Sequence, residues 1–318
     1  MLLLFFSAKN LFLPNKNMPS EGIDDILSID NTSGKGKAAF RVYNDESNAL
    51  TSIVRNHYKL MRKNQTVSFV KKLHEKYSFK DGKYRKIMTI SEAFKILENY
   101  VDSSDPDVSL PNKIHMLQTA ESIRRAGQPD WFQLVGLIHD MGKIMYALGG
   151  VAEDGQEGTA TGPQWALGGD TWVVGCKIPD ACVYPEFNET NLDSNIEEYN
   201  TENGIYSPNC GIDNLLFAYG HDEYIYHMVL ANNTLIPKEG LAMLRYHSAY
   251  PWHTGRAYDR FMIEEDHEKL KWVLEFNKYD LYTKDQNGLN GKDAEELWPY
   301  YQGLIEKYFP NEAAGLKW

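Results

Sequence analysis

Cysteine is scarce in this chain of 318 residues, with only Cys176, Cys182 and Cys210 present. An odd number of cysteines at irregular spacing, in a chain too long to need disulfide bonds for stability, excludes a disulfide-rich secreted domain. The cysteine content therefore favours a reducing compartment, and we expect the protein in the cytoplasm.

Basic residues are too few to balance the acidic ones: 33 lysines and arginines stand against 44 aspartates and glutamates, a net charge of -11. A surface of that sign repels phosphate backbones and anionic lipids. Nucleic acid and membranes are therefore excluded as partners, and we expect a neutral or cationic small molecule.

Long apolar runs are also missing. The chain starts with MLLLFFSAKNLFL, but no basic residue precedes this short apolar run and no small-residue cleavage site follows it, so it lacks the features of a secretory signal. Elsewhere no uninterrupted apolar stretch approaches the roughly 20 residues of a membrane span. With 42% hydrophobic and 24% charged residues, the composition is that of a soluble globular protein.

Helical periodicity dominates the chain after a polar N-terminal segment. Residues 1–40 have no apolar periodicity, which predicts a flexible extension ahead of one domain at 41–318. Helices are predicted by apolar spacing, a capping box at Thr89–Glu92, a capping pair at Asp130 and Gln133, and proline or glycine at the ends. The predicted segments are 52–77, 89–101, 111–127, 130–148, 214–231, 237–248, 266–281 and 294–308.

Only one segment has a strand pattern. TWVVGCKIPDACVY, at 171–184, has two short β-type runs joined by a turn that contains proline. The sequence therefore predicts an all-α fold with a minor β-hairpin. Between 151 and 163 the chain is rich in glycine and glutamate, which predicts a solvated surface loop.

His139 and Asp140 interrupt the most apolar of the predicted helices. A buried ionised pair is costly unless it is hydrogen-bonded or binds a metal. Lys143 follows His139 by four residues, one helical turn, and so shares its face. A hydrogen-bonded His–Asp pair in the core is the alternative interpretation of His139 and Asp140, and an ion pair with Asp140 is the alternative role of Lys143.

The letters HDMGK around this pair resemble the signature of the HD-domain superfamily. In that superfamily an earlier helix contributes a histidine, the His-Asp pair bridges metals, and a late helix contributes an aspartate. His115, beside Ile114 and Leu117, and Asp280, in FNKYDLY, match these two positions.

His221 and His247 lie in two further apolar helical patterns. Taken singly, each is more often a hydrogen-bonded structural histidine. Together with the four residues above they give four imidazoles and two carboxylates, a set that suits iron or manganese better than calcium. With Asp140 bridging, one metal would take His115, His139 and Asp280 and the other His221 and His247. The other histidines, which we expect on the surface, in caps or in support of the ligands, are His57, His74, His227, His253 and His267.

Longer blocks carry a more specific resemblance. Between residues 40 and 318 the chain resembles the myo-inositol oxygenases in the order of these blocks: DSSDPDVSLPNKIHMLQTAE, DWFQLVGLIHDMGK, PQWALGGDTWVVGC, GHDEYIYH, RYHSAYPWHTGRAYD and EFNKYDLYTK. The resemblance implies a helical HD-domain enzyme, a non-haem di-iron oxygenase. It would use a mixed-valent pair of iron ions and dioxygen to open the ring of myo-inositol and give D-glucuronate, and we expect it to act as a monomer.

The same resemblance implies roles for other residues. Lys143 would be catalytic and polarise the reacting hydroxyl, His247 would border the substrate as well as bind metal, and Tyr58 would belong to a lid. A polar lining for the ring would come from Arg41, Asp102, Gly169, Asp170, Ser248 and Lys284. Caps and surface polar groups are the alternative interpretation of this lining.

Two other functions fit parts of the pattern. An HD-type, metal-dependent phosphohydrolase would use the same ligands, but it would need clustered lysines or arginines near the metals. The pattern offers mainly Lys143 and Lys284 against Asp102 and Asp170. A non-catalytic HD fold that acts as a scaffold would not need six ligands and a polar lining.

Overall fold

The structure of the protein is a computed structural model that describes residues 51–105, 111–158, 162–282 and 291–318. The predicted extension at 1–40 and two predicted substrate-binding residues, Arg41 and Lys284, lie outside these ranges.

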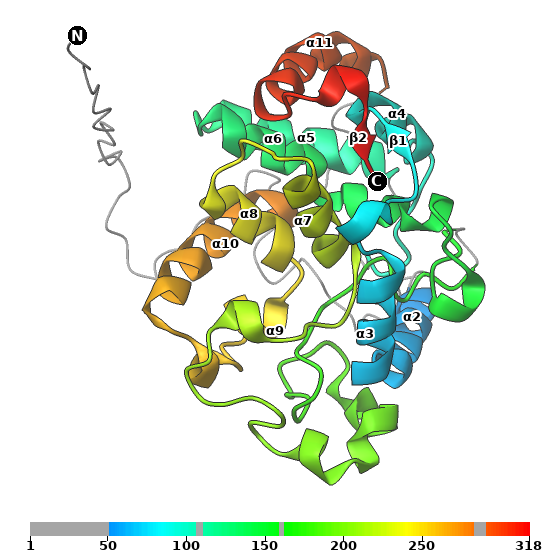
Figure 1. The fold of residues 1–318 in the computed structure, drawn as a ribbon, viewed down its shortest axis with the longest axis vertical. Coiled ribbons are helices and arrows are strands. Elements are labelled where there is room, and N and C mark those ends of the chain that lie inside the picture. The colour runs from blue at the N-terminus through cyan, green and yellow to red at the C-terminus, as the bar shows by residue number, and fades with distance from the viewer. Residues whose placement is uncertain (1–50, 106–110, 159–161, 283–290) are drawn as a thin grey trace, which may run out of the picture.

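Helices make up most of the described chain, which confirms the predicted all-α class (Figure 1). The α-helices are α2 (Thr51–Asn64), α3 (Val67–Lys76), α4 (Ile90–Ile96), α5 (Asn112–Arg125), α6 (Asp130–Ile138), α7 (His221–Ala231), α8 (Lys238–Tyr246), α9 (Tyr250–His253), α10 (Glu264–Tyr282) and α11 (Gly291–Tyr308). Shorter 3-10 segments lie between them: Lys80–Gly82, η3 (His139–Ala147), Ala152–Asp154, Pro185–Thr190, Leu192–Asn195, Glu197–Asn200, Ile212–Asn214, Asp259–Phe261 and Glu312–Ala314.

The helices pack in a bundle around η3. Helices α5 and α6 lie side by side with α11 across them, and α7, α8 and α10 form the next group below (Figure 1). Helix α7 packs on η3 as well as on α8. Helices from both halves of the sequence therefore surround the HDMGK segment.

The small β-sheet lies elsewhere than predicted. Strands β1 (Ile87–Met88) and β2 (Leu316–Lys317) pair antiparallel and hold the last residues against the segment that precedes α4. The predicted hairpin at 171–184 is wrong, because its backbone N–H groups bond to distant parts of the chain. The N–H of Val174 donates to the carbonyl of Leu216 at 2.8 Å, and the N–H of Lys177 donates to that of Thr201 at 2.9 Å.

The predicted helix at 52–77 is two helices, because Thr66 caps a new one. Its hydroxyl accepts a hydrogen bond from the N–H of Phe69 at 3.1 Å, as expected of an N-cap. Gln65 leaves the helical path and donates from its side chain to the carbonyl of Tyr219 at 2.8 Å. The break thus connects α2 and α3 to the segment that leads into α7.

The predicted helix at 130–148 changes type at His139. The residues of α6 are α-helical, but HDMGKIMYA continues as the 3-10 helix η3. In a 3-10 helix residues three apart eclipse one another, so Lys143 lies over Asp140 and not over His139. The predicted capping pair is also wrong: Pro129 is the N-cap, and the side chain of Gln133 donates to the carbonyl of Gln128 at 2.8 Å.

The predicted helix at 214–231 starts seven residues later, at His221. Residues ahead of it are extended, and the N–H of Ala218 donates to the carbonyl of Trp172 at 2.7 Å. This pairing with the 172–174 segment sets where α7 begins, and it places His221 on the first turn of the helix.

The segment 151–163 is anchored in its first half, contrary to the prediction of a solvated loop. Asp154 and Gln156 are buried. Asp154 accepts from Lys72 at 2.6 Å and from Lys76 at 3.0 Å, and Gln156 accepts from the hydroxyl of Tyr77 at 2.8 Å. The segment is therefore fixed to α3.

Asp154→Asn should reduce the free energy of unfolding at pH 7 by about 1 kcal/mol. The effect is small because Lys72, one of the two lysine partners, is 60% exposed and its charge is screened by solvent. Burial alone would raise the pKa of Asp154, but Lys72 and Lys76 hold it below its usual value. A lowered pKa stabilises the fold above the unfolded value of about 3.9. The difference between wild type and variant should therefore shrink as the pH falls below about 4.

Urea unfolding of the metal-free proteins at several pH values measures this difference. The exposed neighbour Glu153, changed to glutamine, is the matched control. A stability difference that stays constant between pH 7 and pH 3 would contradict the ion-pair origin.

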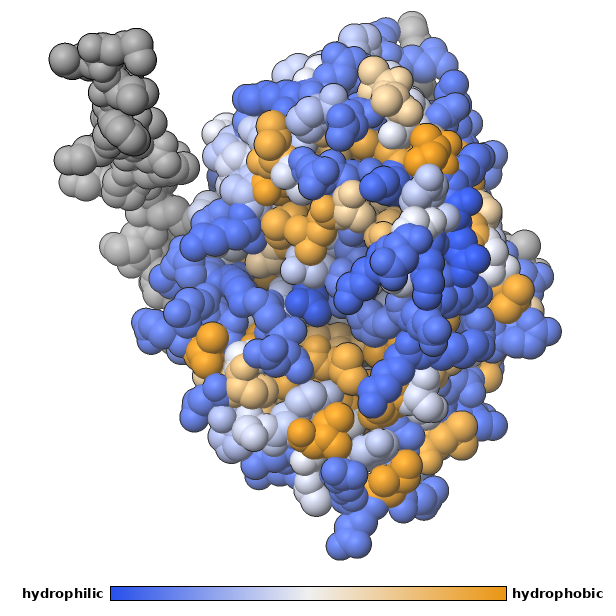
Figure 2. Space-filling model, in the orientation of Figure 1, coloured by the Kyte–Doolittle hydropathy of each residue, from blue (hydrophilic) through white to orange (hydrophobic). Residues whose placement is uncertain are grey.

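The face of the molecule in Figure 2 is mostly hydrophilic, with several separate apolar areas. None of the helices in the described ranges is long and apolar enough to cross a membrane.

Candidate metal centre

The six predicted metal ligands converge at one buried point of the fold. His115 comes from the first turn of α5, His139 and Asp140 begin η3, His221 begins α7, His247 follows α8, and Asp280 lies in the last turn of α10. Each is between 1% and 8% exposed. Five separate elements thus direct polar side chains into the core.

Asp140 lies at the centre of this group. Its Oδ1 is 3.1 Å from Nε2 of His221 and 4.0 Å from Nε2 of His247. Its Oδ2 is 3.6 Å from Nε2 of His139 and 3.8 Å from Nε2 of His115. The two oxygens therefore face two different pairs of histidines.

Asp280 joins only one of these pairs. Its Oδ1 is 3.0 Å from Nε2 of His115 and 3.3 Å from Nε2 of His139, while Nε2 of His221 and Nε2 of His247 lie 2.9 Å apart on the other side. The other five side chains thus form two groups around Asp140, with His115, His139 and Asp280 on one side and His221 and His247 on the other.

The protonation states of three imidazoles follow from their backbone partners. Nδ1 of His139 lies 2.9 Å from the carbonyl of Gly136, Nδ1 of His221 lies 2.7 Å from that of Leu167, and Nδ1 of His247 lies 3.0 Å from that of Leu244. A carbonyl only accepts, so each Nδ1 donates and each neutral ring keeps a lone pair on Nε2.

These Nε2 lone pairs point at one another and at carboxylate oxygens. In the absence of a cation such an arrangement is repulsive, and buried groups of this kind are either paired or bound to a metal. A histidine whose Nδ1 donates to a carbonyl is also the form that binds metal through Nε2. The geometry thus fits two metal ions that share Asp140.

The pKa values of the carboxyls agree with ionised ligands. Burial alone would raise the pKa of Asp140, but Lys143 and His139 hold it well below its usual range. Asp280 is buried too, and His139 and His115 hold its pKa well below the usual range. Burial and the neighbouring histidines lower the pKa of His247, which keeps its ring neutral.

The pKa of His139 is shifted in the opposite direction from that of His247. Burial would lower its pKa, but Asp140 and Asp280 raise it above the usual value. The two carboxylates therefore favour positive charge beside His139.

Lys143 is the cation closest to Asp140. Its Nζ is 2.8 Å from Oδ2 of Asp140 and 2.8 Å from Oδ2 of Asp102, and 3.3 Å from the side-chain oxygen of Asn112. Burial would lower its pKa, but Asp102 and Asp140 raise it, so the ammonium stays charged. The ion pair with Asp140 exists, and it extends to Asp102.

A small cavity opens beside the six side chains. Of the predicted substrate-binding residues, Asp102, Lys143, Gly169, His247 and Ser248 line it. Asp170 does not line it: it is fully buried and its Oδ2 accepts from the N–H of Val183 at 3.1 Å. A larger cavity between 172 and 200 contains none of the predicted ligands.

Sequence reasoning missed four residues of the lining: Ser104, Asp105, Asn112 and Tyr250. Tyr58, predicted as part of a lid, lines the cavity too. Asn112 could have been found, because it precedes His115 by three residues and so shares its face of the predicted helix. The others lie outside helical patterns, so no periodicity marks them.

Comparisons with known proteins agree with this geometry. The family model described as "Myo-inositol oxygenase" matches residues 51–318. The chain is 44% identical to "Inositol oxygenase" of Homo sapiens over 89% of its own length and 93% of that protein. It is 46% identical to "Inositol oxygenase" of Mus musculus over the same shares, and 42% identical to "Inositol oxygenase 2" of Arabidopsis thaliana, over 88% of this chain and 83% of that one. The chain therefore belongs to the myo-inositol oxygenase family.

Proposed function

We propose that this chain is an inositol oxygenase, which cleaves the ring of myo-inositol with dioxygen to D-glucuronate at a mixed-valent pair of iron ions. The observation that carries the proposal is the division of four histidines and Asp280 around the two oxygens of Asp140. Family membership over residues 51–318 supports the substrate.

Iron fits the donors at this centre. Imidazole nitrogens with carboxylate oxygens suit a borderline first-row ion, and the lone pairs on Nε2 can bind one. When bound, such a pair supplies Lewis acidity and electron transfer to the reaction. In this proposal the six residues hold the irons in an HD-type arrangement, and the polar cavity beside them takes the substrate.

Lys143 is the proposed catalytic residue. Its charged ammonium lies between Asp140 and Asp102, so its positive charge is held where a metal ligand and the cavity lining meet. A fixed cation stabilises negative charge on a nearby oxygen. We assign to Lys143 the stabilisation of the substrate oxygen as its proton leaves.

The proposed substrate lining has six further members with roles in binding. Asp102 and Ser248 offer acceptor and hydroxyl groups at the cavity, Gly169 allows close approach of the backbone, and His247 borders both metal and substrate. Arg41 and Lys284 complete the proposal from the resemblance of their sequence blocks, whereas Asp170 is fully buried and does not line the cavity. A polyhydroxylated ring needs several such hydrogen bonds for discrimination.

A phosphohydrolase fits the cavity less well. Lys143 is the one lysine or arginine among the described residues that line it, and two carboxylates already neutralise its charge. A phosphate ester needs clustered cations with free hydrogen-bonding capacity. The cavity therefore favours an uncharged substrate.

Lys143→Met should lower kcat by about 100-fold or more while both metals stay bound, because one fixed charge at the reacting oxygen contributes roughly that much. Steady-state kinetics together with metal analysis measure the effect. Loss of metal from this variant would mean that the lysine serves the centre structurally, through Asp140.

His221→Ala should remove one metal ion per chain and leave the helical fold intact. In the proposed division, His221 and His247 are the two described residues that hold the second metal besides Asp140. Removing one of them leaves too few ligands, whereas the first site keeps all of its own. Metal analysis and circular dichroism check this. Full retention of two metals, or unfolding, would make the division of ligands wrong.

The function itself is tested on protein purified without oxygen. Iron is measured, myo-inositol and dioxygen are added, and D-glucuronate is assayed. Two irons per chain and ring cleavage that depends on dioxygen are the expected result. Hydrolysis of phosphate esters without ring cleavage would overturn the proposal.

We also propose that the protein is a monomer and lies in the cytoplasm. All three cysteines are free, and burial raises the pKa of the Cys176 thiol to about 12. Protonated thiols in the core suit a reducing compartment. Light scattering and cell fractionation are the corresponding measurements.

A further inference from the structure

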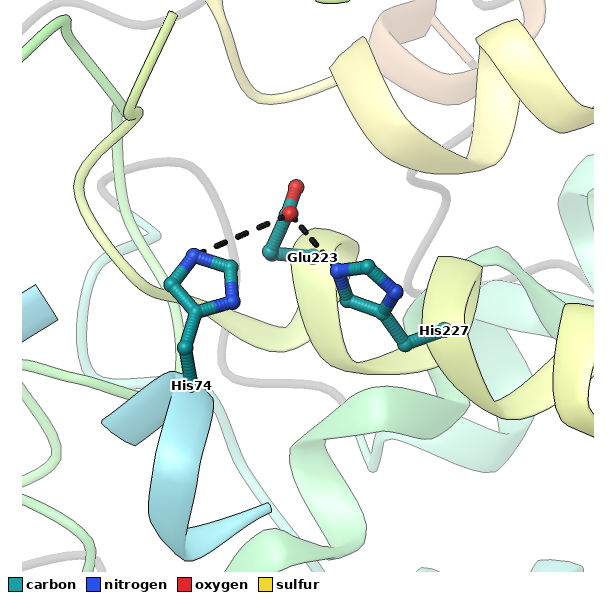
Figure 3. A group of neighbouring side chains, drawn as sticks. All are labelled: His74, Glu223 and His227. Carbon is teal, nitrogen blue, oxygen red and sulfur yellow. Dashed lines mark hydrogen bonds and ion pairs between the residues drawn. The ribbon is translucent and has the colours of Figure 1, made fainter. Parts of the chain in front are cut away.

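A second group of metal-type ligands lies outside the predicted centre. His74 in the last turn of α3 faces Glu223 and His227, which are one turn apart on α7 (Figure 3). Nε2 of His227 is 2.9 Å from Oε1 of Glu223, and Nε2 of His74 is 3.9 Å from the same oxygen. Sequence analysis predicted no metal pattern for either histidine.

We propose that His74, Glu223 and His227 bind one further transition-metal ion of the Zn²⁺ class, which links α3 to α7. One ligand atom from each lies within 4.8 Å of the others. In a tetrahedral site with bonds of about 2.0–2.1 Å, ligand atoms lie roughly 3.3 Å apart. The two measured distances bracket this spacing, so small side-chain rotations close the site.

The position of His74 is not explained by a hydrogen bond to Glu223. The contact between His227 and Glu223 is an ordinary pair four residues apart on a helix. The 3.9 Å separation of His74 from Glu223 is too long for a hydrogen bond. A cation bound to Oε1 of Glu223 and to the Nε2 atoms of both histidines would account for the position of His74.

The exposure of the three side chains and the neutral ring of His74 also suit a bound ion. The side chain of Glu223 is 5% exposed, whereas those of His74 and His227 are 29% and 38% exposed. An ion can therefore enter from solvent and keep water as its fourth ligand. Burial lowers the pKa of His74, which leaves its ring neutral and able to bind metal.

Arg245 orients the carboxylate of Glu223 and does not block the proposed metal site. Its Nε donates to Oε2 of Glu223 at 2.8 Å, and its Nη2 donates to Oε1 at 3.1 Å. Nη1 of Arg245 is also 3.6 Å from Asp213, and its guanidinium lies 4.7 Å from the ring of Tyr226. Asp213 is also paired with Lys269 at 2.6 Å, so these four groups together carry no net charge. The arginine thus holds Oε2 in place while Oε1 faces the histidines, as outer hydrogen bonds do for ligating carboxylates.

The test uses the full-length protein after the metal of the main centre has been loaded and counted. Zn²⁺ is added, unbound ion is removed, and each metal is measured again. We expect one zinc per chain, with the metal of the main centre retained. X-ray absorption at the zinc edge should show nitrogen and oxygen neighbours at about 2.0–2.1 Å.

His227→Gln is the main variant, because the amide can still donate to Glu223 and preserve the helix. We expect at least about a 10-fold weaker zinc affinity in this variant and in His74→Gln, with the main centre still loaded. His267→Gln, an exposed histidine of α10, is the matched control and should bind zinc like the wild type.

Equal zinc binding by wild type and His227→Gln would overturn the proposal, as would zinc that enters only by displacing metal from the main centre. Neither readout depends on ring cleavage. Failure of the proposed enzymatic function would therefore leave this result unaffected, and the reverse holds as well.

Discussion

Asp140→Asn should lose both metal ions and at least about 1000-fold in kcat. Both oxygens of Asp140 are used, Oδ1 toward His221 and Oδ2 toward His139 and Lys143. An amide supplies one weak oxygen ligand and a nitrogen that cannot bind the second ion. Metal catalysis supplies several kcal/mol of stabilisation, and about 4 kcal/mol corresponds to 1000-fold.

Metal analysis of purified Asp140→Asn measures the first effect, and turnover of myo-inositol measures the second. Asp81→Asn is a suitable control, because Asp81 is exposed and its φ of 55° is a conformation that asparagine adopts readily. Two tightly bound metals in Asp140→Asn would mean that Asp140 does not bridge them.

Gly142→Ala should destabilise the fold by about 3 kcal/mol and weaken metal binding by at least about 10-fold. A Cβ at Gly142 would lie 1.9 Å from the carbonyl oxygen of His221 and 2.6 Å from its carbonyl carbon. Both atoms are backbone, so no rotamer change relieves the clash. The start of α7 must move away from η3 and take the His221 ligand with it.

Urea unfolding and metal titration of Gly142→Ala measure the two effects. Gly303→Ala in α11 is the matched control, because a Cβ there meets nothing within 4 Å. Alanine in an exposed helix is more stable than glycine by up to about 1 kcal/mol. If Gly142→Ala behaved like this control, the close packing of η3 against α7 would be wrong.

The local sequence predicted the helices whose ends carry their own signals. Thr89 and Glu92 form the capping box that was predicted from their spacing, and α5 begins after Pro111 and ends before Gly127. Capping and φ preference act within one turn, so neighbouring residues determine them. These boundaries needed no distant contact.

Predictions failed where distant contacts control the backbone. The segment 171–184 has strand-like residues, but its N–H groups find acceptors at Leu216 and Thr201. Helix α7 starts at His221 because the preceding residues pair with 172–174. Such competition between local propensity and long-range hydrogen bonding is invisible in a window of neighbouring residues.

The sequence predicted which six side chains meet at the candidate centre, but not the contacts of the residues around them. Buried histidines and carboxylates on apolar helices are rare enough to be noticed, and the resemblance to a family assigned them to metals. In an α-helix, the spacing of four residues would put Lys143 on the face of His139. The 3-10 geometry of η3 instead joins Lys143 to Asp140 and Asp102.

By itself, the sequence determined the all-α class, the helices with capping signals and the six side chains that meet in the core. Only the tertiary structure decided which oxygen of Asp140 faces which histidines, that Lys143 pairs with Asp102, and that His74 meets Glu223 and His227. The reason is physical. Periodicity and capping report interactions within a few residues, whereas a metal centre depends on distances between elements that are far apart in the chain and are fixed by packing.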